Sequence, residues 1–138
     1  MIPIALLVGC RTDSTPRRAG EMTMVPYVFE RADGHREEAE FGRLLVPENR
    51  HASESRLVEI AFLRLKGKAP TGAPPFVFLA GGPGNSGINS ARARSTTAFY
   101  DELRQIGDVI LLDQRSAGLS LPKLDCLEPV EMPLDRPG

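Results

Sequence analysis

The chain has 138 residues, 41% hydrophobic and 25% charged, which is the composition of an ordinary globular domain able to bury one core. Its 17 Lys and Arg residues nearly balance 18 Asp and Glu residues, so a net charge of −1 gives no reason to expect nucleic acid or an acidic partner. No stretch approaches the roughly 20 apolar residues of a transmembrane helix. We expect neither a cofactor nor a metal ion.

The chain begins with an apolar, uncharged stretch that ends in Leu7-Val8-Gly9-Cys10. This ending resembles a bacterial lipobox, in which the cysteine receives a lipid. A secretory signal normally has a basic region before its apolar stretch, and none is present here, so the true start could lie upstream. We expect a signal peptide with a lipobox over residues 1–10 and an exported protein anchored to the bacterial cell envelope through Cys10. The alternative is a buried first strand that ends in a free cysteine.

A polar segment follows, because residues 11–20 are rich in Arg, Ser, Thr, Asp and Pro. We expect a disordered tether over residues 11–23 and a folded domain over residues 24–138. The domain would begin with a short strand at residues 26–30. A strongly charged stretch, residues 31–40, would contain a turn.

Two further strands are predicted next, at residues 41–46 and 57–66. The second alternates in polarity, with Val58, Ile60 and Phe62 on one face. A polar connection separates the two strands, which favours antiparallel pairing.

The most informative stretch is residues 76–87, which read FVFLAGGPGNSG. A short apolar run without charge predicts a strand buried on both faces, as in the middle of a parallel sheet. The glycines that follow permit positive φ angles and the close approach of a ligand, and Pro83 stiffens the turn. Open α/β sheets place their ligand sites at such loops, although glycine-rich turns also serve purely structural purposes.

A second apolar strand, residues 108–113, also runs into a polar loop. Between the two strands, Phe99, Leu103 and Ile106 fall on one face of a predicted helix that Gly107 would end. The expected fold is therefore α/β, with an antiparallel strand pair followed by a parallel β-α-β unit. One helix cannot cover both faces of these strands, so part of the apolar surface should be exposed.

Three motifs lie within a region that covers somewhat more than half of the chain: FGRLLVPENR at residues 41–50, LAGGPGNSG at residues 79–87 and VILLDQRSAGLS at residues 109–120. Together they resemble the amino-terminal half of the α/β-hydrolases related to proline iminopeptidase and the secreted tripeptidyl aminopeptidases. Two positions depart from that pattern. Ala80 stands where the group often has His, and Ser116 stands where it usually has Gly.

The resemblance implies an incomplete α/β-hydrolase sheet. In that fold, one oxyanion donor is a backbone N–H of the loop after the third strand. The residues that the resemblance places in this oxyanion loop are Gly81, Gly82, Pro83 and Gly84, with Gly82 as the best candidate donor. The residues that it places at the structural rim of the site, paired with each other or with neighbouring loops, are Asp113, Gln114 and Arg115.

The catalytic triad is missing from the sequence. A nucleophile elbow needs Gly-x-Ser-x-Gly followed by an acid and a His, and no such pentapeptide occurs. Ser86 stands on the oxyanion loop with no His after it, so we do not assign it as the nucleophile. His35 and His51 lie in polar segments and are expected to be solvated. We therefore interpret the chain as the amino-terminal fragment of a longer hydrolase, inactive alone.

Two classes of function stay open. The first is a truncated serine hydrolase, most simply an exopeptidase that releases amino-terminal residues from short peptides, or an esterase that acts on small esters. The second is a non-catalytic surface lipoprotein module that binds through the half-fold. In both classes the lipid on Cys10 contacts the membrane. Cys126 would then be the only free thiol, and we expect its disulfide partner in the missing carboxyl-terminal part.

Overall fold

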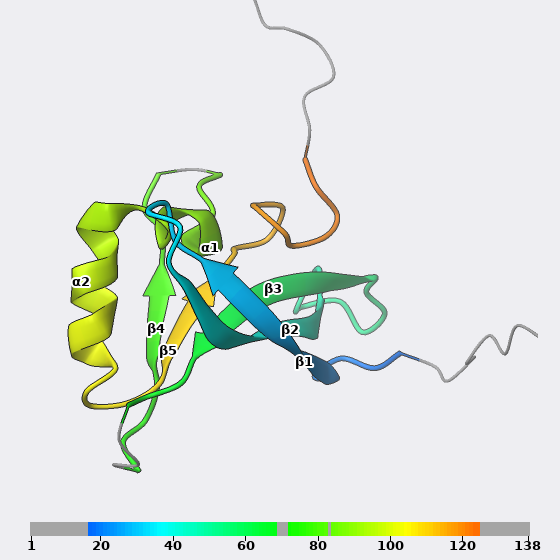
Figure 1. The fold of residues 1–138 in the computed structure, drawn as a ribbon. Helices are drawn as coiled ribbons and strands as arrows, with labels where there is room; N and C mark the ends of the chain where they lie inside the picture. Colours follow the sequence, from blue (N-terminus) through cyan, green and yellow to red (C-terminus); the bar gives the residue numbers. More distant parts are fainter. Residues whose placement is uncertain (1–16, 69–71, 83, 125–138) are drawn as a thin grey trace, which may run out of the picture.

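The structure, a computed structural model, describes residues 17–68, 72–82 and 84–124 (Figure 1). These residues form one open sheet of five strands in the order β1-β2-β3-β5-β4. The strands are β1 (Met22–Glu30), β2 (Arg36–Pro47), β3 (Leu57–Leu65), β4 (Phe76–Leu79) and β5 (Val109–Leu112). The helices are α1 (Gly87–Ser90) and α2 (Arg94–Leu103).

The sheet is mostly antiparallel. β1, β2 and β3 pair antiparallel in sequence order, β3 pairs antiparallel with β5, and only β4 and β5 are parallel. Both helices lie between β4 and β5 in the chain, which completes a β-α-β unit. The prediction is thus confirmed in its coarse form: the described residues are a mixed α/β fragment with one parallel strand pair.

The amino-terminal part of the sheet is longer than predicted. Met22 and Thr23, which we expected in the tether, already belong to β1 and pair with Leu44 and Arg43. The charged residues 36–40 belong to β2 rather than to a loop. Their acidic side chains are accommodated because Glu37 and Glu40 both have arginine partners. Residues 11–16 of the predicted tether, Cys10 and Cys126 lie outside the described residues.

One face of the sheet is covered by α1 and α2. α2 runs beside β4 in Figure 1. The core on this face combines residues from every strand except β4 with residues from both helices: Phe29, Ala39, Leu63, Leu65, Ile88, Ala91, Tyr100, Val109 and Leu111. Phe76 and Phe78 of β4 pack against this core from the edge of the sheet. We call this side the covered face.

The apolar face predicted for the crossover helix is correct for Leu103, which packs against the core, and wrong for Phe99 and Ile106. Phe99 is 56% exposed and Ile106 is 51% exposed, whereas Tyr100 is buried and its ring lies 5.3 Å from that of Phe78. α2 ends at Leu103, so the chain no longer follows the helical period when it reaches Ile106. The large aromatic Tyr100 takes the position against the sheet, and burial raises the pKa of its hydroxyl.

The opposite side, which we call the open face, is apolar and has no helix over it within the described part of the chain. A shallow depression of about 460 Å³ on it is lined mainly by Met22, Met24, Leu44, Phe62, Val77, Ile110 and Leu112. β4 lies at the sheet edge, and its Val77 and Leu79 are more than half exposed. The prediction that this strand is buried on both faces is therefore wrong, whereas the expectation of exposed apolar surface is confirmed.

None of the described helices is both long and apolar enough to cross a membrane.

Candidate functional site

The glycine-rich loop follows β4 and begins at the carboxyl end of the parallel strand pair. Gly81, Gly82 and Gly84 are exposed, and Pro83 lies outside the described residues. Gly82 has φ of 81° and Gly84 has φ of 83°, so both adopt the left-handed conformation that favours glycine. Asn85 closes the loop, because its side-chain amide donates to the Gly81 carbonyl at 2.8 Å and its backbone N–H to the Gly82 carbonyl at 3.3 Å.

The loop has free backbone donors. Among the described residues, the N–H groups of Gly81, Gly82 and Gly84 have no hydrogen-bond partner. All three glycines are exposed and carry no side chain of their own that could cover these groups. Unpaired, exposed N–H groups of this kind can donate to the oxygen of a substrate on which negative charge develops.

Ser86 ends the loop and begins α1. Its hydroxyl donates to Asp113 Oδ1 at 2.7 Å and accepts a hydrogen bond from the Asn89 backbone N–H at 2.9 Å. Accepting from N3 of the helix is the usual geometry of an N-cap serine. The hydroxyl proton is directed at a carboxylate that is already part of the structure, so the geometry supports a capping role rather than a nucleophilic one.

The rim residues Asp113, Gln114 and Arg115 follow β5. Asp113 is fully buried, and its carboxylate binds Ser86, the Ile88 N–H and the Leu119 N–H. The Gln114 side-chain amide donates to the Ala80 carbonyl at 3.2 Å, and Arg115 donates to the Pro47 carbonyl at 3.3 Å. The structure thus joins Asp113 and Gln114 to the glycine-rich loop.

Arg115 reaches a different part of the molecule, the end of β2. Of the two pairings that we expected for Asp113 and Arg115, contacts with neighbouring loops are observed, and no ion pair between the two residues exists in the described structure. Ser116 has φ of 62°, in the left-handed region that costs a side chain about 1–2 kcal/mol.

The two histidines lie in connections between other strands. His35 is in the turn between β1 and β2, where its backbone N–H donates to Asp33 at 3.0 Å. His51 is in the connection between β2 and β3, and its backbone N–H donates to Asn49 at 3.0 Å. Among the described residues, neither side chain contacts the glycine-rich loop through a hydrogen bond or ion pair. No group of three or more His, Cys, Asp and Glu side chains able to hold a metal occurs within the described ranges.

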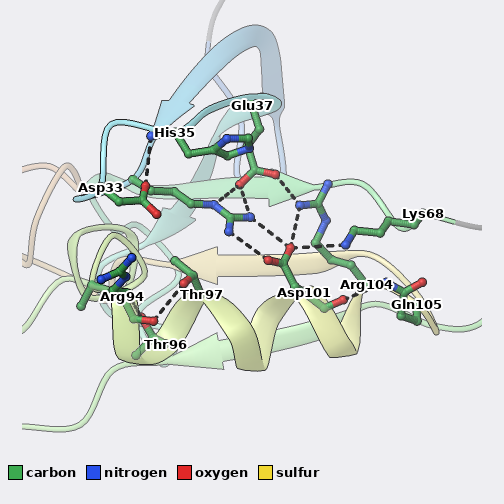
Figure 2. Close-up of polar contacts among 12 residues, drawn as sticks. Asp33, His35, Glu37, Lys68, Arg94, Thr96, Thr97, Asp101, Arg104 and Gln105 are labelled. Atoms are coloured by element: carbon green, nitrogen blue, oxygen red, sulfur yellow. Dashed lines mark hydrogen bonds and ion pairs between the residues drawn. The ribbon is translucent and has the colours of Figure 1, made fainter.

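Sequence reasoning missed a cluster of ion pairs, which we call the charge clamp: Arg31, Glu37, Lys68, Asp101 and Arg104. Figure 2 shows Glu37, Asp101, Arg104 and Lys68 turned toward one another. Arg31 binds both oxygens of Asp101, at 2.9 and 3.0 Å, and also binds Glu37 at 2.7 Å. Arg104 binds Glu37 as well. The clamp fastens α2 to the turn end of the β1–β2 hairpin.

The clamp shifts the acid–base equilibria of its members. The hydrogen bond from Arg31 holds the pKa of the Asp101 carboxyl below its usual range, and the charges of Lys68 and Arg104 act in the same direction. The same hydrogen bond raises the pKa of Arg31 above its usual range. The only hint in the sequence was the i,i+3 spacing of Asp101 and Arg104, which is common on helix surfaces. The described contacts of the clamp join α2 to the β1–β2 hairpin, which supports a structural role.

The chain matches no protein-family model, no curated protein and no solved structure in the comparisons made with it. The candidate site is therefore defined by its own geometry. It is the loop after β4 with the unpaired N–H groups of Gly81, Gly82 and Gly84, which ends at Ser86 and is hydrogen-bonded to the loop after β5.

Proposed function

We propose that this chain supplies the oxyanion-binding loop and the amino-terminal half of the fold of a serine hydrolase, most simply an exopeptidase that releases amino-terminal residues from short peptides. The observation that supports this most directly is the set of unpaired N–H groups at Gly81, Gly82 and Gly84, at the carboxyl end of the strand in a β-α-β unit. The sequence motifs at residues 41–50, 79–87 and 109–120 support the same proposal.

The role of the loop is electrostatic. When a nucleophile attacks the carbonyl carbon of a peptide, negative charge develops on the carbonyl oxygen, and fixed N–H donors stabilise that charge. Gly82 is the proposed donor, and its left-handed backbone fixes the direction of its peptide groups. The nucleophile, acid and base belong to the carboxyl-terminal part of the proposed enzyme, because Ser86 is occupied as a helix cap. A lipid on Cys10 that anchors the exported enzyme to the cell envelope is part of the same proposal.

The test uses the complete coding sequence and the variant Gly82→Val. A Cβ atom at Gly82 would lie 2.8 Å from the Asn85 side-chain amide, and φ of 81° is strained for any side chain. Gly82→Val should therefore displace the amide and lower kcat by about 10²–10³, with a smaller change in KM. The measurement is steady-state kinetics on aminoacyl and short peptidyl chromogenic substrates, with small esters as the comparison.

The matched control is Gly34→Val. Gly34 has φ of 83°, nearly the same as Gly82, but lies in the β1–β2 turn with open space around it. This variant carries the same backbone strain and should keep kcat. Near wild-type kcat in Gly82→Val would overturn the proposed role of the loop. A reading frame without Gly-x-Ser-x-Gly downstream of Gly138 would overturn the hydrolase proposal itself and favour the non-catalytic module.

A further inference from the structure

Asp113 is a buried carboxylate held entirely by neutral donors. Its side chain is fully buried, and its partners are the Ser86 hydroxyl at 2.7 Å, the Ile88 N–H at 3.1 Å and the Leu119 N–H at 2.8 Å. Asp113 forms no ion pair with an Arg, Lys or His side chain of the described residues. Burying a carboxylate without a cationic partner costs free energy. Hydrogen bonds to both of its oxygens are therefore needed to offset that cost.

The partners of Asp113 come from two separate loops. Ser86 and Ile88 belong to the end of the glycine-rich loop and the start of α1, whereas Leu119 belongs to the loop after β5. Two glycines make the close packing possible. A Cβ atom at Gly118 would lie 2.1 Å from Asp113 Oδ2, and one at Gly87 would lie 2.4 Å from the Leu112 carbonyl oxygen.

The bonding pattern requires a carboxylate rather than an amide. Oδ1 accepts from the Ile88 N–H, and Oδ2 accepts from the Leu119 N–H. Asparagine has only one side-chain oxygen, so its NH₂ group would face one of these two N–H donors. An amide could therefore bind one loop but not both.

The neighbouring residue Gln114 holds the other end of the glycine-rich loop. Its side-chain amide donates to the carbonyl of Ala80, the buried residue that precedes Gly81. Gly81, Gly82, Gly84 and Asn85 thus lie between two fixed points, Ala80 and Ser86. Both points are bound by consecutive residues of the β5 loop.

We propose that Asp113 and Gln114 are positioning residues that fix the two ends of the glycine-rich loop, so that the β5 loop determines where the Gly81, Gly82 and Gly84 amides point. The consequence for catalysis rests on the proposed hydrolase function. The structural inference does not, because it concerns only contacts within this chain. Neither residue touches a reacting group; each acts through the loop.

The first experiment measures the loop in this 138-residue chain. Amide NMR spectra would be recorded for wild type, Asp113→Asn and Gln114→Ala. The Gly81, Gly82 and Gly84 signals should move or broaden in both variants, and hydrogen exchange at Ile88 and Leu119 should become at least about tenfold faster in Asp113→Asn. Gln114 is exposed, so Gln114→Ala should stay folded even if Asp113→Asn does not.

The chain offers a matched control for each variant. Asp108 also accepts a backbone N–H bond, from Gly67 at 2.7 Å, and Gln105 also donates to a backbone carbonyl, that of Asp101 at 3.3 Å. Asp108→Asn and Gln105→Ala should leave the three glycine signals unchanged. Glycine signals that stay unchanged in Gln114→Ala and in folded Asp113→Asn would overturn the inference.

The second experiment measures kcat and KM of the same variants in the complete enzyme. Asp113→Asn and Gln114→Ala should lower kcat by about tenfold or more while KM changes by less than about threefold, because a displaced oxyanion donor weakens transition-state binding. Altered glycine signals combined with unchanged kcat in Gly82→Val would mean that the positioning is real and the hydrolase role is wrong. Unaltered glycine signals in the Asp113 and Gln114 variants, combined with a lowered kcat in Gly82→Val, would mean that the hydrolase role is supported and the positioning inference is wrong.

Discussion

The two faces of the sheet are built from the same strands but differ in what lies over them. On the covered face, Leu63, Val109 and Leu111 are fully buried beneath α1 and α2. On the open face, Val77 is 55% exposed and Leu79 is 56% exposed, although Phe76 and Phe78 of the same strand pack against the core. Side chains alternate along a strand, so adjacent residues of one strand experience opposite environments.

This difference shows where the stability of the described chain arises. Apolar side chains stabilise a fold only when folding removes them from water, at about 25 cal/mol per Å². The covered face meets this condition, and the charge clamp holds its helix in place. On the open face Met22, Val77 and Leu79 stay more than half exposed to water, where a contiguous apolar patch favours association with other surfaces.

The largest expected effect comes from one leucine on each face. Leu63→Ala should lower the free energy of unfolding by about 2–5 kcal/mol, because it leaves a cavity between β3 and the helices. Leu79→Ala removes the same atoms from a site that is 56% exposed and should cost less than about 1 kcal/mol. Urea unfolding followed by circular dichroism measures both. Equal losses would show that the open face is buried in solution.

Much of the sheet could be predicted from the sequence. The alternation of Val58, Ile60 and Phe62 identified β3, and the uncharged runs at residues 76–79 and 109–112 identified β4 and β5. The environment of β4 could not be predicted, because an uncharged run has the same pattern whether or not a second layer covers it. The helix face was predicted correctly for Leu103 only. Ile106 lies beyond the end of α2, and Tyr100 rather than Phe99 is buried against the sheet, neither of which the spacing of three apolar residues reveals.

The candidate site was predictable in position but not in its contacts. The glycines and proline of residues 81–84 mark a loop after a strand, and the structure finds Gly82 and Gly84 in the left-handed conformation. The contact of Asp113 with Ser86 joins residues 27 positions apart in the chain, and the contacts of Arg31 with Asp101 join residues 70 positions apart. Spacing in one sequence carries no signal for such pairs, because either partner alone is an ordinary charged or polar residue.

A smaller effect is expected at the charge clamp, which helps to hold the helix on the covered face. Asp101→Asn removes the carboxylate that Arg31 binds with two hydrogen bonds and should lower the free energy of unfolding by about 1–2 kcal/mol at pH 7. The folded-state pKa of Asp101 lies below its unfolded value. Its contribution is therefore present above a pH of about 4 and is lost as the pH falls through the folded pKa.

The difference in stability between wild type and Asp101→Asn should accordingly shrink as a pH series descends from pH 7 to below about pH 4. Thermal melts across this range measure it. The neighbouring carboxylate Glu102, which is exposed on α2, gives the control. Glu102→Gln should change stability by less than about 0.5 kcal/mol at any pH in the series. A constant difference for Asp101→Asn over the whole range would contradict a role for its charge.

The smallest change in stability is expected for Val77→Thr, and its comparison with Val109→Thr separates the faces most directly, because the same substitution is made on each. Val77→Thr and Val109→Thr exchange a methyl group for a hydroxyl of similar size in the two parallel strands. Val109 is fully buried, so its variant should lose about 1–3 kcal/mol to an unpaired hydroxyl. Val77 is 55% exposed, so its variant should stay within about 0.5 kcal/mol of wild type.

Val77→Thr should also bind less of an apolar fluorescent dye and aggregate more slowly, because the substitution makes the open face more polar. Dye fluorescence and light scattering measure these effects, and unchanged dye binding in Val77→Thr would show that the open face is not the surface that associates.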